Sequence, residues 1–431
     1  FAGHDRSQER RAQASDAANR SVRLNPSSFE ARYALAYFYR LEDASYREGE
    51  RILRQLAAER PGDGRIWRTL GIALRMGTNF AGNSRGRDEE AVETLRTAAA
   101  LPGGDPIALG WLSSALMNLG RFDEAEQALE RAIALRPQGI PLVSKVSFLL
   151  RYRGDLAGAR EGLAHVPIDL LRQDFGAFSA AQTWWCAREP EKIIEVLRGL
   201  PRDYIEAVFD GPKGLLTGLA HRLAGRPQAA EIEWRSALQV VDRRLTSEPN
   251  NLRLLIWKSR LLACLGDLAQ ARRLFQAAEQ LGFSVRDAYW AATIAVELRD
   301  IDKAVALLAI ALKEPSVATR AFLRINPTWD PLRGDPRFEA LVAEPASAKA
   351  NAKTQSSAAT TSDPKSIAVL PFVNLGADKG DEYLGDGLTE ELLSALSQIK
   401  GLRVPGRSSC FAFKGKTGDD IFRQVGERLG V

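Results

Sequence analysis

The chain has 431 residues, 45% of them hydrophobic and 26% charged, which is the balance of a folded protein. No run of about eighteen apolar residues occurs, so no membrane span is expected in this sequence. The net charge of +5 is spread along the chain and gives little support for nucleic acid as a partner, so we expect none. Cys186, Cys264 and Cys410 lie far apart, which indicates neither a disulfide framework nor a zinc site.

A repeating pattern of apolar and small residues fills residues 1–325. In the clearest unit, 106–137, these residues recur at spacings of three and four on two expected helices that meet at Gly120, and Pro137 ends the second helix. A glycine followed five residues later by an alanine recurs at Gly120/Ala125, Gly154/Ala159, Gly225/Ala230 and Gly266/Ala271. Weaker units centre on Ala14, Gly49, Ala91, Ile194 and Ala304. The pattern predicts about nine helical hairpins between residues 1 and 315.

Two of the repeat spacings are longer than the others. Between Met76 and Arg87, glycine and asparagine residues predict a turn-rich insertion of about eight residues within one hairpin. Between Gln239 and Pro249, the second helix of another hairpin is predicted to run about two turns longer.

The repeats resemble tetratricopeptide repeats over roughly three quarters of the chain. The resemblance lies in Trp67-x-x-Leu70-Gly71 followed by Ala91 and Leu95, and in the unit that ends at Pro137. It implies a mostly α fold, a right-handed α-solenoid that binds other molecules in its groove. Such repeats serve many unrelated binding tasks, so the motif indicates the fold and not the ligand.

The array is predicted to end in a cap over residues 326–343, a segment rich in prolines and glycine. Trp329, Leu332 and Phe338 are expected to cover the exposed end of the last hairpin. Residues 344–365 hold no branched or aromatic apolar residue, which predicts a flexible linker.

Residues 366–431 have a different periodicity, which predicts a small α/β unit in the order β, α, β, α. The predicted strands are 367–372 and 402–404, and the predicted helices are 387–399, with Asp386 as its cap, and 420–429. Two strands are fewer than an independently stable sheet needs, so the predicted unit is only part of an α/β domain.

This segment resembles the TolB-like amino-terminal domain of bacterial proteins. The resemblance rests on Ser366–Phe372, Asp386–Leu392 and the stretch from Arg403 to Gly415. It implies a bacterial regulatory or signalling protein, in which such a domain often follows a class III adenylate cyclase, a protein kinase or a winged-helix DNA-binding region, frequently across a membrane span. The first residue is Phe1, so we interpret the chain as a piece of a longer protein.

No catalytic, cofactor or metal-binding residues are predicted, because His4, His165 and His221 lie far apart and no catalytic motif occurs. The first helices of the hairpins, which face the concave surface of such solenoids, carry basic and aromatic candidates for a peptide groove. Guanidinium groups there suit acidic or carboxylate-bearing peptides, unless these arginines only solvate helix faces. The candidates are Arg65, Arg68, Arg75, Arg151, Tyr152, Arg222, Arg253 and Arg260.

The sequence therefore favours a non-catalytic scaffold that binds a protein or peptide partner. The alternative is the sensor or regulatory arm of a larger enzyme, such as an adenylate cyclase or a kinase, or of a winged-helix transcriptional regulator. A preceding membrane span would place the repeats in the periplasm, toward which the resemblance leans, and its absence would place them in the cytoplasm. The sequence predicts no oligomeric state.

Overall fold

The computed structural model describes residues 8–39, 45–81, 84–137, 139–206, 209–315, 318–343 and 367–371, and single positions at 389, 392, 393, 396, 405 and 425. The chain divides into two compact units, residues 1–343 and residues 344–431, which we take separately.

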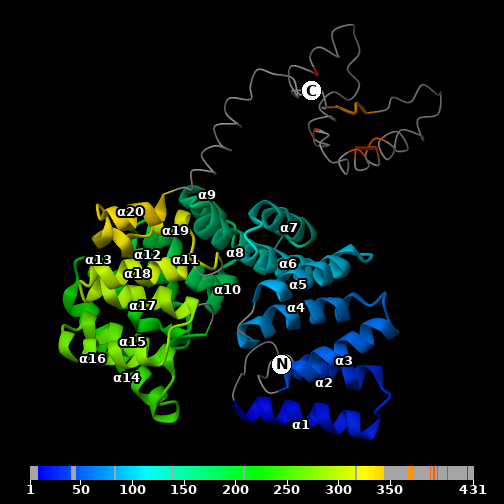
Figure 1. The fold of residues 1–431 in the computed structure, drawn as a ribbon, viewed down its shortest axis with the longest axis horizontal. Coiled ribbons are helices and arrows are strands. Elements are labelled where there is room, and N and C mark those ends of the chain that lie inside the picture. Colours follow the sequence, from blue (N-terminus) through cyan, green and yellow to red (C-terminus); the bar gives the residue numbers. More distant parts are fainter. Residues whose placement is uncertain are drawn as a thin grey trace. The chain divides into compact units, whose positions relative to one another are not determined.

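The first unit is built from helices that follow one another along the chain as hairpins (Figure 1). A single helix, α1 (Gln8–Leu24), comes first and packs against α2. Eight hairpins follow within the described residues, so together with α1 they account for the nine predicted units. The hairpins pair α2 (Phe29–Tyr39) with α3 (Tyr46–Glu59), α4 (Gly64–Ala81) with α5 (Ser84–Ala100), α6 (Pro106–Asn118) with α7 (Phe122–Leu135), α8 (Ile140–Phe148) and the π-helical turn η1 (Leu149–Arg153) with α9 (Leu156–Ala164), α11 (Asp174–Cys186) with α12 (Pro190–Arg198), α13 (Lys213–Leu223) with α14 (Pro227–Ser247), α15 (Leu252–Cys264) with α16 (Leu268–Gln280), and α17 (Val285–Glu297) with α18 (Ile301–Ala311).

The turns within the hairpins explain why some repeats are clear in the sequence and others are not. The four predicted glycines all have a left-handed backbone, for example Gly266 with φ of 89°. In the α11–α12 and α17–α18 hairpins the same position is taken by Arg188 and Arg299, each with φ of 57°. A glycine pattern therefore cannot find these two hairpins, although their backbone makes the same turn.

The structure corrects one predicted irregularity and confirms the other. Helix α4 continues to Ala81 and α5 begins at Ser84, so the predicted turn-rich insertion is wrong and most of its residues lengthen the two helices. A hairpin accommodates added residues in helical hydrogen bonds when both arms grow together. Helix α14 runs for 21 residues, against 13 in α15 and 13 in α16, which confirms the longer helix.

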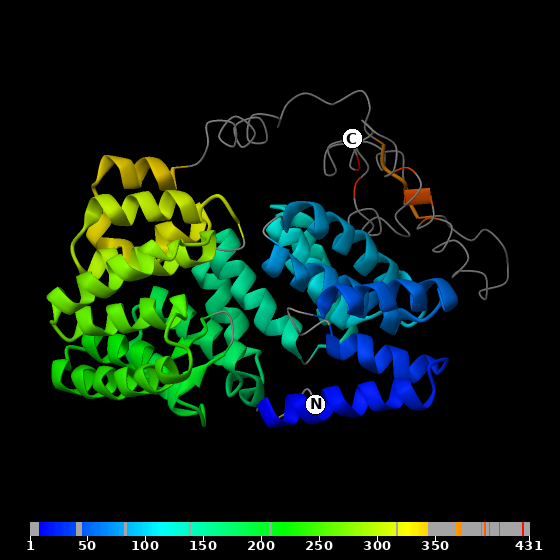
Figure 2. The ribbon, with the colours of Figure 1, turned by 60° about the horizontal axis from the view of Figure 1, so that its bottom comes forward.

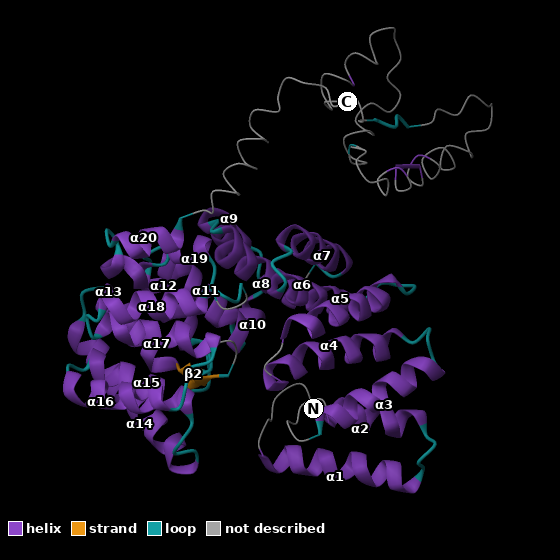
Figure 3. Cartoon of the chain, in the orientation of Figure 1, coloured by secondary structure: helices purple, strands orange, loops and turns teal. Residues whose placement is uncertain are grey.

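A short antiparallel β-hairpin that the sequence did not predict lies between α12 and α13. Its strands are β1 (Tyr204–Ile205) and β2 (Gly211–Pro212), and β2 packs against α15 (Figure 3). The turn between them inserts Phe209, which is fully buried, against Trp257 with ring centroids 4.8 Å apart. Aromatic rings from α11, α15 and α17 surround Phe209, and ring contacts continue from them to Trp329 in the C-terminal segment. The rings in this row are Phe178, Phe209, Trp257, Tyr289, Trp290 and Trp329. The inner side of these hairpins is therefore a packed aromatic core.

After α18 the chain turns back toward earlier hairpins. This segment holds α19 (Arg320–Ile325), the 3-10 helix η2 (Pro327–Leu332) and α20 (Pro336–Val342), and a short helix α10 (Ile168–Leu171) precedes α11. Helix α20 packs on α18, whereas α19 packs on η1 and η2 packs on α17. Trp329, Leu332 and Phe338 are fully buried. The segment thus covers the last hairpin and also closes its inner side.

The apolar core of the first unit has two parts. One part is formed mainly by α2–α7, and the other by α8–α20, shown in green to yellow as one bundle in Figure 2. Helix α8 belongs to both, because Val146 packs in the second part and Phe148 in the first.

Little of the second unit lies within the described residues. Residues 367–371 have an irregular backbone, so the strand predicted at 367–372 is not seen there; a strand needs a paired neighbour, and the segment 402–404 lies outside the described residues. Thr389, Leu392, Leu393 and Leu396 are helical, within the helix predicted at 387–399. Val369 and Leu393 form a small buried cluster against Leu396. The linker at 344–365 and all of the helix predicted at 420–429 except Val425 also lie outside the described residues.

Candidate functional site

Most of the predicted groove arginines pair with carboxylates of the same chain. Arg68 on α4 contacts Asp105, the cap of α6, at 2.7 Å, and Arg65 contacts Asp63 at 2.7 Å and Glu30 at 3.5 Å. These pairs link neighbouring hairpins. Because each guanidinium already has a carboxylate, Arg65 and Arg68 contribute little free positive charge to the surface.

Three predicted arginines of the later hairpins converge on α17. The Arg222 guanidinium makes two hydrogen bonds to Glu297, at 2.9 and 2.7 Å, and Arg253 contacts Asp287 at 2.7 Å. The side chains of Arg253 and Arg260 are only 14% and 5% exposed. The expected exposure of these two residues on a concave surface is therefore wrong, because the aromatic core fills the inner side of their hairpins.

The remaining candidates do meet around one cavity. It measures about 210 Å³ and is lined by the first helices of several hairpins, and we call it the arginine cavity. Arg75 on α4 and Arg151 and Tyr152 on η1 line it, as does Arg286 on α17, which the sequence analysis missed. Its polar lining is completed by Ser114, Asn118, Ser144, Ser147 and Gln182. The structure thus brings three of the eight predicted residues together with Arg286, although the four are spread from position 75 to position 286 of the sequence.

Arg286 differs from the other arginines of this group. No described residue hydrogen-bonds to it or pairs with it within ion-pair distance, and it is exposed. Part of the side chain reaches solvent, but the surrounding cavity wall keeps much of the water away from the guanidinium. This desolvation, followed by the charges of Arg253, Arg75 and Arg151, lowers the pKa of Arg286, while Glu314 acts in the opposite direction. The sequence held a signal for it: Arg286 is the second residue of α17, as Arg253 is of α15.

Arg75 and its partner are deeply placed. Its Nε lies 3.4 Å from Oδ1 of Asp88 on α5, and Asn118 donates to the other oxygen at 3.0 Å. Burial lowers the pKa of Arg75 and raises the pKa of Asp88, because the loss of water disfavours the charged form of each group. Asp88 therefore offsets the charge of Arg75 within the cavity wall.

The C-terminal segment holds η1 in place beside the cavity. The Thr319 hydroxyl donates to the backbone carbonyl of Arg151, and the Arg151 guanidinium lies 5.9 Å from the centre of the Phe322 ring. The Tyr152 ring stacks on Phe148 at 5.6 Å. The cavity wall is thus supported by residues far apart in the chain.

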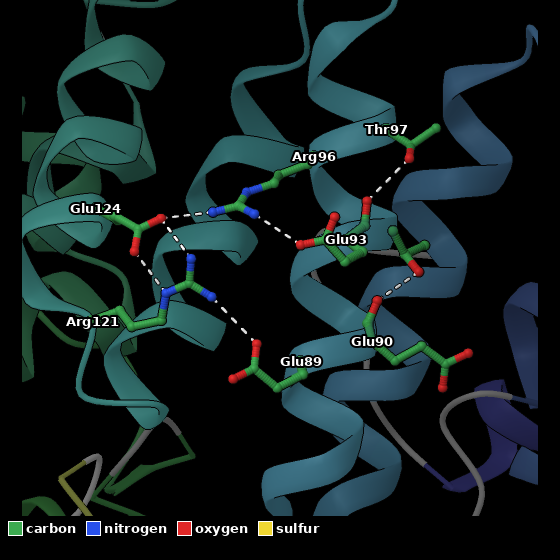
Figure 4. Close-up of polar contacts among 8 residues, drawn as sticks. Glu89, Glu90, Glu93, Arg96, Thr97, Arg121 and Glu124 are labelled. Atoms are coloured by element: carbon green, nitrogen blue, oxygen red, sulfur yellow. Dashed lines mark hydrogen bonds and ion pairs between the residues drawn. The ribbon is translucent and has the colours of Figure 1, made fainter. Parts of the chain in front are cut away.

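The second helices carry a different kind of charge cluster. Figure 4 shows Arg121, at the start of α7, between Glu89 and Glu124, with ion-pair distances of 3.3 and 2.7 Å. Arg96 reaches the same Glu124 at 2.6 Å. Each guanidinium group of this cluster pairs with a carboxylate. Arg96 and Arg121 therefore cover helix faces and link neighbouring helices, as in the alternative interpretation of the arginines. Such exposed pairs each contribute about 0–1 kcal/mol.

Two further searches concern only the described part of the chain. No group of three His, Cys, Asp or Glu side chains is arranged to hold a metal ion. No helix combines the length and apolar character needed to cross a bilayer.

Comparisons with known proteins support the repeat assignment. Residues 84–146, from α5 into α8, match the tetratricopeptide repeat family model, which confirms the resemblance for this segment. "Putative adenylate cyclase 3" of Rhizobium meliloti (strain 1021) is 50% identical over 66 residues, which is 15% of this chain and 11% of that protein. The chain thus spans a small part of that relative. The resemblance to a TolB-like domain is not shown by these matches.

Among solved structures, yeast Tom70 is 13% identical and covers 73% of this chain and 66% of its own, with a TM-score of 0.41. The human IFIT1 dimer with m7Gppp-AAAA is 15% identical and covers 64% and 69%, with a TM-score of 0.39. Neither superposition establishes a shared overall arrangement.

Proposed function

We propose that this chain is a non-catalytic protein-interaction scaffold and that its arginine cavity receives an acidic segment of a partner protein. The observation that carries the proposal is Arg286, which lines the cavity beside Arg75 and Arg151 and has no carboxylate within ion-pair distance among the described residues. The tetratricopeptide match supports a protein partner. Arg65, Arg68 and Arg222 are assigned to the links between hairpins in this proposal.

The lining of the cavity suits a carboxylate better than a neutral group. Arg286 comes from α17 and can donate two hydrogen bonds to one carboxylate, and the positive charge of Arg151 on η1 lies in the same lining. Asn118 and Ser147 add neutral donors, and Tyr152 adds a hydroxyl. A Lys or Arg side chain of a partner would be repelled, so the cavity selects for acidic sequences.

The test is peptide binding to the whole chain, measured by fluorescence anisotropy with a random acidic peptide and a matched peptide that carries Gln and Asn in place of Glu and Asp. Arg286→Gln is expected to weaken binding of the acidic peptide about tenfold or more. The control is Arg235→Gln, an exposed arginine of α14 that pairs with Glu231 and lies outside the cavity. Equal binding of both peptides, or an Arg286→Gln variant that binds as well as the control, would refute the acidic specificity.

We further propose the organisation that the chain would have as such a scaffold. Residues 1–325 form a right-handed solenoid, residues 326–343 cap it, residues 344–365 are a linker, and residues 366–431 are a partial TolB-like domain. The buried Trp329, Leu332 and Phe338 support the cap. The limit of the first compact unit at residue 343 supports the linker boundary.

A second candidate function is the regulatory arm of a larger bacterial enzyme. The 50% identity with "Putative adenylate cyclase 3" over 66 residues favours a cyclase over a kinase or a winged-helix regulator. The gene sequence around this segment decides between them, since a cyclase domain encoded in the same reading frame is expected. A membrane span encoded before the repeats would favour the periplasm for them.

A further inference from the structure

A second cavity of the first unit lies beside the aromatic core. It measures about 60 Å³, and we call it the inner cavity. Apolar side chains form most of its wall, with Phe178 and Trp290 on one side and Leu219 and Phe322 on others. Its polar lining is Gln182, Arg260, Thr293, Asn326 and Thr328. The mixture is that of a small-molecule site, a mostly apolar wall with a few polar groups.

Arg260 on α15 is the one charged residue in the described lining of this cavity. Its side chain is only 5% exposed, and its nearest carboxylate oxygen, Oε1 of Glu297, is 3.9 Å away. Its Nε is buried without a hydrogen-bond partner. Five N–H groups of a guanidinium need acceptors, and a buried one without them is costly.

The charges around Arg260 do not balance. Glu297 is already held by Arg222 through hydrogen bonds of 2.9 and 2.7 Å. Two guanidinium groups therefore share one carboxylate. Burial and the nearby Glu297 raise the pKa of Cys264 to about 12, so its thiol is neutral and adds no negative charge. A net positive charge remains next to an apolar cavity, and an anion placed there would neutralise it.

We propose that the inner cavity binds a small monocarboxylic acid with a short carbon chain, whose carboxylate pairs with Arg260. The cavity, at about 60 Å³, has room for several water molecules and so for a ligand of only a few heavy atoms. The carboxylate accepts hydrogen bonds from Arg260, with Thr293 and Asn326 near it. The carbon chain lies against Phe178 and Trp290.

This site is separate in chemistry from the arginine cavity, although Phe178, Gln182, Tyr289 and Trp290 line both. The arginine cavity is larger and carries several guanidinium groups, whereas the inner cavity is apolar with one. A ligand that depends on Arg260 is therefore a free acid and not an acidic peptide. Because the two cavities share these wall residues, binding of the acid in the inner cavity can change the shape of the arginine cavity.

The experiment titrates the whole chain with propionate and, in parallel, with propionamide, its neutral counterpart, at constant ionic strength. Binding is followed by tryptophan fluorescence, since Trp185 and Trp290 line the cavity, and by the thermal midpoint. Propionate is expected to saturate the signal in the millimolar range, and propionamide to bind about tenfold or more weakly. Arg260→Met is expected to bind propionate about tenfold or more weakly than the wild-type chain does. Arg235→Gln is expected to bind propionate with the wild-type affinity.

A second variant guards against a folding defect in Arg260→Met. Ala181→Val keeps the guanidinium and adds carbon atoms to the cavity wall, so it is expected to weaken propionate binding by reducing the space. Equal affinity for propionate and propionamide, undiminished binding by Arg260→Met, or no saturable binding by the wild-type chain would each overturn the proposal. Loss of Glu-containing peptide binding in Arg260→Met, with binding retained in Arg286→Gln, would also overturn it, since the inner cavity would then be the peptide site.

Discussion

The indole of Trp185 donates its Nε1–H to Oδ1 of Asn326 across 3.2 Å, which joins two residues 141 positions apart. Thr328 Oγ1 lies 3.1 Å from the same nitrogen, and Asn326 Nδ2 lies 3.4 Å from the Tyr289 hydroxyl. Asn326 is 4% exposed. One amide therefore ties the C-terminal segment to α11 and α17 and closes the inner side of the later hairpins.

Asn326→Ala is expected to lower the free energy of unfolding by about 2 kcal/mol, because it removes the hydrogen bonds of the Asn326 amide to Trp185, to the Tyr289 hydroxyl and to the backbone N–H of Thr328. Urea denaturation followed by tryptophan fluorescence measures the change. Asn25→Ala is the control, since Asn25 is exposed and its substitution is expected to stay within about 0.5 kcal/mol. Equal stability of the two variants would show that the segment is not held by Asn326.

Arg299→Gly is expected to stabilise the chain by about 0.5–1 kcal/mol. Arg299 is exposed and has φ of 57°, a backbone conformation that costs a side chain energy and costs glycine little. Thermal unfolding with the equivalent Gly266→Ala variant gives the matched test. Gly266 has φ of 89° and no atom within 4 Å of an added Cβ, so Gly266→Ala is expected to destabilise by about 1 kcal/mol through the backbone alone. Two changes of the same sign would contradict the argument.

Glu297→Gln is expected to cost about 2–3 kcal/mol at pH 7, because it leaves the buried Arg260 without its nearby carboxylate and weakens two hydrogen bonds from Arg222, which is 44% exposed. Burial works against the charged form of Glu297, but hydrogen bonds and charge from Arg222, with Arg260, outweigh it and lower its pKa. A carboxyl group whose pKa is lower in the folded state stabilises that state at pH values above the pKa in the unfolded state, about 4.3. This contribution is lost as the pH falls through the pKa in the folded state. The difference between wild type and variant should therefore shrink below about pH 4.

Denaturation curves at several pH values test this. Glu48→Gln is the control, because Glu48 and Arg51 form an exposed pair, 47% and 57% exposed, worth about 0–1 kcal/mol. A wild-type advantage over Glu297→Gln that persists unchanged into acid would show that the charge of Glu297 is not its cause.

Local patterns in the sequence predicted the hairpins well. Apolar spacing of three and four marks the helices, and glycine in a left-handed turn marks where the chain reverses. Glycine does not mark the turns at Arg188 and Arg299, and the units centred on Ile194 and Ala304 were predicted there from weaker repeats. The pattern failed at the insertion near residue 80, where residues with low helix propensity extend helices whose two arms lengthen together.

The candidate site was less predictable, because its properties depend on contacts between distant repeats. Nothing near Arg222 in the sequence indicates that Glu297, 75 positions away, satisfies its guanidinium. Arg260 is likewise 4% exposed and lines a cavity together with Phe178 and Asn326, which lie 82 and 66 positions away in the sequence. Arg286, in contrast, holds the same helix position as Arg253 and was open to prediction from the repeat register.

The first unit is expected to fold without the second. All residues of its two core clusters lie within residues 1–343, where the compact unit ends. A fragment of residues 1–343 should therefore unfold with the thermal midpoint that the helical signal shows for the whole chain, measured by circular dichroism. A fragment of residues 1–325 is the contrast, because it lacks Trp329, Leu332 and Phe338, all fully buried. Loss of one large buried aromatic side chain costs about 3–5 kcal/mol, so the shorter fragment should melt at a much lower temperature or fail to fold. If both fragments melt together, the segment after α19 does not close the inner side of the hairpins in solution.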